Sequence, residues 1–127
     1  MVLVREYERL WDSIKSAPDV FAFLEQHDPT ESSQILAVLL SDQRRRWLTE
    51  HPLRVEDYLA RLHDVPDSVD WKLPLAIGEF EARRKTSRPL SIHEISSRFP
   101  DLRDTLRDRL EKLTASERAQ SGRSHAA

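Results

Sequence analysis

DQRRRWLTEHPLRVEDYLARL, residues 42–62, is matched 37 positions later by EFEARRKTSRPLSIHEISSRF, residues 79–99. The two copies share an acid at the first position, an arginine four residues on, and a Pro-Leu pair that begins at Pro52 and Pro89. Each copy is typical of a long helix, a Pro-Leu loop and a short helix, because proline ends a helix and the residue before it avoids helical backbone. One such unit cannot cover its own apolar face, so the repeat predicts two stacked units that share a core.

The rest of the chain is predicted to complete a single all-α domain of about seven helices over residues 1–113. Of the 127 residues only two are glycine, whereas a β-rich fold needs more glycine for its tight turns. An N-terminal helical pair precedes the two repeat units, which span about residues 35–64 and 72–101. Leucines at spacings of four, four and three predict a closing helix over residues 102–113. No apolar periodicity follows, so residues 114–127 are expected to be a disordered tail.

The charge and composition of the chain argue against several classes of function. Its 20 basic and 22 acidic residues give a net charge of −2, whereas nucleic-acid-binding domains usually carry a basic excess. The N-terminus has no signal peptide, and the longest apolar run, Ile35 to Leu40, is too short to cross a bilayer. We therefore expect a cytoplasmic protein without a membrane partner. The chain lacks cysteine and its five histidines have no ligand spacing, so no metal and no cofactor are expected.

Each repeat unit carries a basic turn at the end of its long helix, and the two turns suggest different interpretations. The first, Arg44 to Trp47, could be a nucleic-acid patch, but nearby acids favour an exposed helix end with Trp47 buried. The second, residues 83–88, holds four basic residues and no acid. It contains Arg-Arg-x-Thr, a pattern that basophilic kinases accept, so Thr86 and Ser87 are candidate phosphorylation sites. The alternative, which we favour, is a plain linker turn.

An ordered set of motifs runs through residues 35–113. It consists of an acid followed by Arg-Trp, an acid-tyrosine pair in a short helix, a second helix with glutamate and arginine, and a final Arg-Phe-Pro-acid-Leu signature. The residues that carry it, together with the two loop prolines, are Asp42, Arg46, Trp47, Pro52, Glu56 or Asp57, Tyr58, Glu79, Arg83, Pro89, Arg98, Phe99, Pro100 and Leu102. This order resembles the helical segment found ahead of the catalytic domain in many planctomycete-type bacterial serine/threonine protein kinases. The resemblance implies that these residues are structural.

The resemblance implies an accessory module and not an enzyme. The chain has no Gly-rich phosphate loop, Val-Ala-Ile-Lys strand, His-Arg-Asp loop or Asp-Phe-Gly motif, so no catalytic residue is expected. What remains is a non-enzymatic helical interaction or regulatory module in bacterial signalling. Its expected partner is a kinase domain or another signalling protein, contacted through an exposed groove between the two units. The alternative is a DNA-binding module, because loop–helix units can resemble helix-turn-helix elements.

Overall fold

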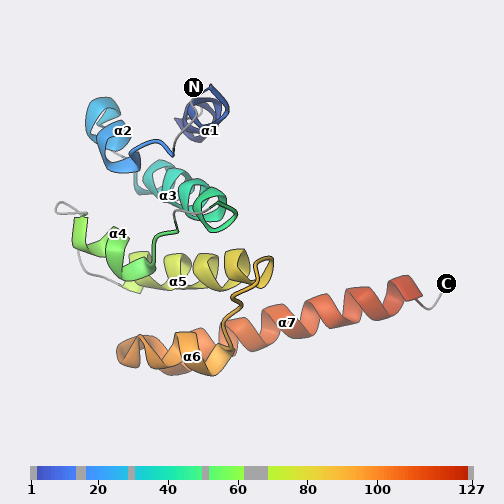
Figure 1. Ribbon diagram of the computed structural model, residues 1–127. Coiled ribbons are helices and arrows are strands. Elements are labelled where there is room, and N and C mark those ends of the chain that lie inside the picture. The colour runs from blue at the N-terminus through green and yellow to red at the C-terminus, as the bar shows by residue number, and fades with distance from the viewer. Residues whose placement is uncertain (1–2, 14–16, 29–30, 50–51, 62–68, 126–127) are drawn as a thin grey trace.

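The computed structural model describes residues 3–13, 17–28, 31–49, 52–61 and 69–125, and these residues form helices without any strand (Figure 1). The all-α prediction is therefore confirmed. The elements in chain order are α1 Leu3–Ser13, α2 Val20–His27, α3 Ser32–Trp47, α4 Val55–Arg61, α5 Val69–Arg84, α6 Ile92–Ser97, the 3-10 turn η1 Pro100–Leu102 and α7 Arg103–His125.

The helix bounds repeat at the same 37-residue offset as the sequence. Helix α3 covers residues 32–47 and α5 covers residues 69–84, while the short helices α4 and α6 begin at Val55 and Ile92. The duplication is therefore present in the structure. The long helices begin at Ser32 and Val69, three residues before the approximate unit bounds of 35 and 72.

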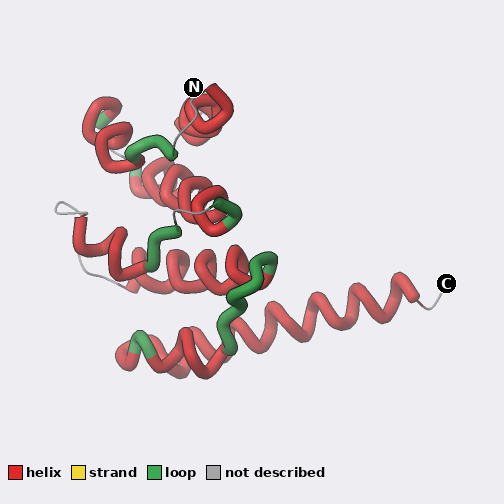
Figure 2. The backbone as a smooth tube through the Cα atoms, in the orientation of Figure 1, coloured by secondary structure: helices red, strands yellow, loops and turns green. Residues whose placement is uncertain are grey.

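The helices form a stack in which each unit covers the apolar face of its neighbour. Helix α3 packs against α1 on one side and α5 on the other, and α5 also contacts α7. Each short helix lies on the next long helix along the chain: α2 on α3, α4 on α5 and α6 on α7. Figure 1 shows this order from α1 at the top to α7 at the bottom, and Figure 2 shows the loops between the helices in green. Stacking therefore buries the apolar face that a single unit would leave exposed.

One apolar core runs through the stack. Equivalent positions of the two units are buried alike, Val38 with Leu75 and Tyr58 with Ile95. The leucine seam of η1 and α7 closes the core at one end through Leu102, Leu106 and Leu110. The core also includes Leu3, Tyr7, Val20, Phe23, Leu39, Val55, Trp71, Ala76, Phe80 and Phe99.

Helices α3 and α5 approach each other closely at Gly78. A Cβ atom at this position would lie 2.2 Å from Gln43 Oε1 and 2.8 Å from a methyl carbon of Leu40. Gln43 is buried, and its Nε2 donates a 2.9 Å hydrogen bond to the Leu75 carbonyl, which holds the amide in place. A side chain at this position would have to displace the Gln43 amide and the Leu40 methyl group, so the contact between the two units favours glycine.

We expect Gly78→Ala to lower the free energy of unfolding by about 1–3 kcal/mol through overpacking. The expected sign is opposite to that of helix propensity, which favours alanine over glycine by about 1 kcal/mol. Urea unfolding measures the change, and Thr105→Ala on the exposed side of α7 is the control, with an expected change within about 0.5 kcal/mol. A Gly78→Ala variant that is as stable as the parent, or more so, would contradict this close approach.

The last helix is longer than the leucine spacing predicts. The predicted closing helix over residues 102–113 and disordered tail over 114–127 are corrected, because α7 continues to His125. Alanine, glutamate, arginine and glutamine occur in this stretch, and their intrinsic helix propensity is high even where no apolar periodicity is present. Glu117 of α7 also forms a 2.5 Å ion pair with Arg84 of α5. Residues 126 and 127 of the predicted tail lie outside the described residues.

Candidate functional site

Asp42 of α3 is a buried carboxylate at which three helices meet. Its side chain is fully buried and accepts hydrogen bonds from the hydroxyl of Tyr7 on α1 and, at 2.6 Å, from that of Tyr58 on α4. Arg46, one turn further along α3, donates from Nε at 2.7 Å. The same arginine donates from Nη2 to the Pro18 carbonyl at 2.6 Å, ahead of α2. The arrangement, here called the Asp42 cluster, ties α1, α4 and the start of α2 to α3.

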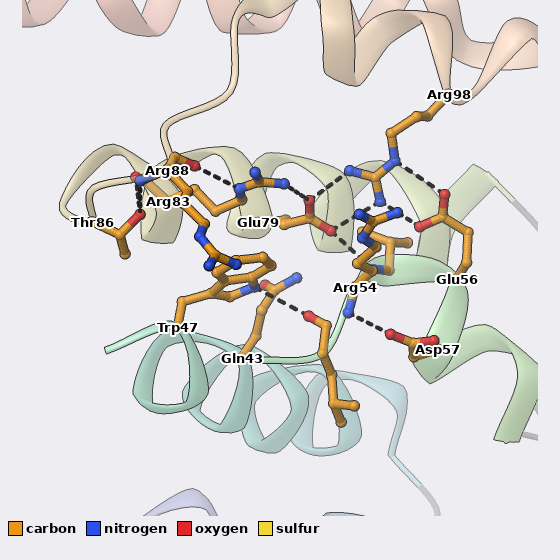
Figure 3. Close-up of polar contacts among 12 residues, drawn as sticks. Gln43, Trp47, Arg54, Glu56, Asp57, Glu79, Arg83, Thr86, Arg88 and Arg98 are labelled. Atoms are coloured by element: carbon orange, nitrogen blue, oxygen red, sulfur yellow. Dashed lines mark hydrogen bonds and ion pairs between the residues drawn. The ribbon is translucent and has the colours of Figure 1, made fainter. Parts of the chain in front are cut away.

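Glu79 holds the equivalent position in α5 and is also fully buried (Figure 3). Its Oε1 accepts from the backbone N–H of Val55 at 3.0 Å, at the start of α4. Arg98 donates to both carboxylate oxygens, at 2.5 and 3.0 Å, and Arg83 lies 3.3 Å from Oε2. Arg98 is further bound by Glu56 of α4. The arrangement, the Glu79 cluster, joins the short helix of the first unit to both helices of the second.

The charges of Arg98 and Glu56 stabilise each other across the two units. Burial alone would lower the pKa of Arg98, but its hydrogen bonds to Glu79 and Glu56 outweigh burial and raise it. Burial would raise the pKa of Glu56, but the hydrogen bond from Arg98, a backbone hydrogen bond and the charges of Arg98 and Arg54 together outweigh burial and lower it. Both groups are therefore held in their charged forms. The pair was not foreseen from the sequence, because its members are 42 positions apart.

Most of the signature residues lie in these two clusters or pack beside them. Trp47 is buried, as predicted, and its Nε1 donates to the Leu53 carbonyl at 3.1 Å. The Arg83 guanidinium carbon lies 4.6 Å from the centroid of the Trp47 ring, and Figure 3 shows the two side chains together. Phe99 is buried and Pro100 begins η1, whereas the loop prolines 52 and 89 are exposed. The buried, paired members of the set are placed to hold the helices together.

The three arginines of the first basic turn do not form a continuous patch. Arg46 belongs to the Asp42 cluster, and Arg45 forms a 3.1 Å ion pair with Asp12 of α1. Of the three, only Arg44 is exposed. This distribution supports the interpretation of residues 44–47 as a helix end.

Tyr7 and Tyr58 are the only tyrosines of the chain, and both serve the Asp42 cluster. Burial, reinforced by the nearby Asp42 carboxylate, raises the pKa of each phenol well above its usual range. Because the unfolded phenols ionise near pH 10, their contribution to stability is complete below that pH and is lost as the pH rises above it.

An alkaline titration is expected to show no phenolate absorbance until the helices unfold. The helical circular dichroism signal and the ultraviolet phenolate signal should change together, above about pH 10. Free N-acetyl tyrosinamide, titrated in parallel, gives the unperturbed curve. Phenolate absorbance that follows the free compound while the helical signal stays constant would contradict the burial of these hydroxyls.

A groove of about 670 Å³ lies between α3 and α5, on the surface shared by the two units. Its apolar lining comes from both helices, and Leu48, at the C-terminal end of α3, is 60% exposed. No other large hydrophobic side chain within the described residues is as open to solvent. The lining residues are Leu40, Arg44, Leu48, Pro74, Ile77, Gly78, Glu81, Ala82, Arg84, Lys85 and Glu117.

The rim of the groove carries unpaired positive charge. Arg84 and Glu117 neutralise each other in an ion pair. Arg44, Glu81 and Lys85 are exposed and make no ion pair within the described part of the chain. Among the described residues, the rim therefore offers two cations and one carboxylate without ion-pair partners around an apolar floor. The sequence predicted a groove between the units, but not that Leu48 would stand at its edge.

The candidate phosphorylation sites lie in the turn after α5. Thr86 and Ser87 border a hollow of about 280 Å³, together with Arg88 and with Trp47, Thr49 and Pro52 from the first unit. Thr86 is half-buried and Ser87 is exposed. The two basic turns, separate in the sequence, are thus neighbours in the fold.

Comparison with known proteins assigns no family to this arrangement. No protein-family model, curated protein or solved structure matches the chain. The resemblance to kinase-associated segments therefore stays a prediction that rests on the signature residues. Among the described residues no three histidine or acidic side chains are placed to hold a metal ion. No described helix combines the length and apolar character needed to cross a bilayer.

Proposed function

We propose that this chain is a non-enzymatic helical interaction module in cytoplasmic bacterial signalling, with the groove between α3 and α5 as its contact surface. The observation that carries the proposal is the exposed Leu48 beside an apolar floor. An exposed apolar patch with a polar rim is typical of a protein contact site. The same two helices, α3 and α5, carry the buried carboxylates Asp42 and Glu79, whose hydrogen bonds hold these helices to their neighbours.

The charges on the rim favour one kind of occupant. Arg44 and Lys85 have no partner of their own within the described residues, so an acidic segment could pair with both. The floor, between Leu40 and Ile77, favours an apolar stripe on the same segment. The proposed partner is thus a protein that presents an amphipathic helix with acidic flanks. A kinase domain or another signalling protein is the partner that the resemblance to kinase-associated segments favours.

Site-specific crosslinking in the native host tests the proposal. A photo-reactive amino acid replaces Leu48 or Ile77 in the groove, or Ala60 on the exposed side of α4 as the control. The same protein should be captured from both groove positions and not from the control. The crosslinked peptide of that protein should carry acidic residues next to an apolar stripe. Capture from the control position alone would overturn the proposal.

The purified partner then gives a quantitative prediction. Leu48→Glu is expected to weaken binding at least about tenfold, because it places a charge among apolar contacts and opposes an acidic partner. The free energy of unfolding should stay within about 0.5 kcal/mol, because Leu48 is largely exposed. Isothermal titration measures the affinity, and Ala60→Glu is the matched control. Unchanged affinity in Leu48→Glu would contradict the proposed contact surface. Salt-dependent binding of the parent to duplex DNA, in place of a protein, would contradict the proposed function.

A further inference from the structure

The turn after α5 presents two neighbouring hydroxyl groups in different environments. Thr86 Oγ1 donates to the Arg83 carbonyl at 2.8 Å and accepts from the Arg88 N–H at 3.1 Å. Arg83 Nε closes the same turn by donating to the Arg88 carbonyl at 2.9 Å. Ser87, between them, is exposed, and its hydroxyl makes no hydrogen bond within the described residues.

A third hydroxyl nearby is also occupied. Ser91 has an arginine three residues before it, as Ser87 does. Its Oγ accepts from the Glu94 N–H at 3.0 Å and caps the N-terminus of α6. Thr86 and Ser91 must each give up helix-end or turn hydrogen bonds before their oxygens can react, whereas Ser87 gives up none.

We propose that Ser87, and not Thr86, is the residue of this turn that an arginine-directed serine/threonine kinase phosphorylates. The sequence pattern Arg83-Arg84-Lys85-Thr86 alone favours the threonine, so the fold shifts the site by one residue. In the reaction Ser87 Oγ attacks the γ-phosphorus of ATP and the bond from that phosphorus to the β–γ bridging oxygen breaks. ADP leaves, and the hydroxyl proton passes to the catalytic base of the kinase.

The modification would change the charge next to the groove. A phosphate adds about −1.5 to −2 charge at pH 7, close to Lys85 on the rim. If the proposed function holds, phosphorylation of Ser87 weakens the binding of an acidic partner. The assignment of Ser87 depends only on the hydrogen bonds of the turn after α5, so it can be tested without the partner of the groove.

Phosphosite mapping on the intact chain and on a peptide separates the effect of the fold from that of the sequence. The full chain and a synthetic peptide of residues 79–90 are each incubated with the same purified arginine-directed kinase, ATP and Mg²⁺. Fragment mass spectra then distinguish phosphate on Thr86 from phosphate on Ser87. The ratio of Ser87 to Thr86 modification should be at least about tenfold higher in the chain, where the threonine must first lose two hydrogen bonds.

Two variants complete the test. Ser87→Ala should reduce phosphate incorporation into the chain at least about tenfold, and Thr86→Ala should leave modification of Ser87 in place. Equal site ratios in chain and peptide would overturn the inference, as would a chain modified mainly at Thr86. So would a chain that takes up no phosphate under conditions that saturate the peptide. None of these outcomes depends on whether the groove binds a protein, so the two proposals fail separately.

Discussion

Glu79→Ala is expected to lower the free energy of unfolding by about 3–5 kcal/mol, the usual cost of removing one partner from a buried ion pair. The substitution leaves two partly buried guanidinium groups, those of Arg83 and Arg98, without their shared carboxylate. It also leaves the Val55 N–H at the start of α4 without its acceptor. The loss is a large part of the stability of a domain of this size, which is about 5–15 kcal/mol. Urea unfolding followed by circular dichroism measures it.

Glu81→Ala is the matched control for this experiment. Glu81 has the same side chain two residues further along α5, is exposed, and makes no ion pair within the described residues. Its removal should change the stability by no more than about 0.5 kcal/mol. If Glu79→Ala and Glu81→Ala cost the same, the Glu79 cluster does not join the two units.

Asp42→Ala is expected to be comparably costly, about 3–5 kcal/mol, because Asp42 is the repeat equivalent of Glu79. The variant leaves two buried tyrosine hydroxyls without their acceptor, those of Tyr7 and Tyr58. It also removes the carboxylate that pairs with the largely buried Arg46. A loss of this size can unfold the domain completely, so Asp42→Asn is measured as well. Asparagine keeps one acceptor oxygen, and the loss of stability should therefore be smaller.

Asp12→Ala is the control for the Asp42 cluster. Asp12 also pairs with an arginine of α3, Arg45, but its side chain is exposed, so its removal should cost less than about 1 kcal/mol. Equal losses in Asp12→Ala and Asp42→Ala would mean that the buried position of Asp42 contributes nothing.

The repeat made the order of long and short helices in the two units predictable. An acid and an arginine four positions apart lie on the same face of a helix, so Asp42 with Arg46 and Glu79 with Arg83 were readable as pairs. The pattern of apolar residues likewise placed Trp47 inside.

What the sequence did not predict depends on how the helices stack. The hydrogen bond from Val55 to Glu79 and the ion pair of Arg98 with Glu56 join residues that are far apart in the sequence, so helical periodicity does not predict them. The exposure of Leu48 and the close approach of α3 and α5 at Gly78 both depend on tertiary packing. The length of α7 was missed because the leucine seam ends at residue 113, although the residues beyond it favour helix.

Methyl NMR of the chain during titration with its captured partner tests the proposed contact surface most directly. With leucine, isoleucine and alanine methyl groups labelled, the signals of Leu48, Ile77 and Ala82 should shift, because these residues line the groove. The signals of Leu59 on α4 and Ile92 on α6, outside the groove lining, should stay in place. Shifts at Leu59 and Ile92 with the three groove signals unchanged would contradict the α3–α5 groove as the contact surface.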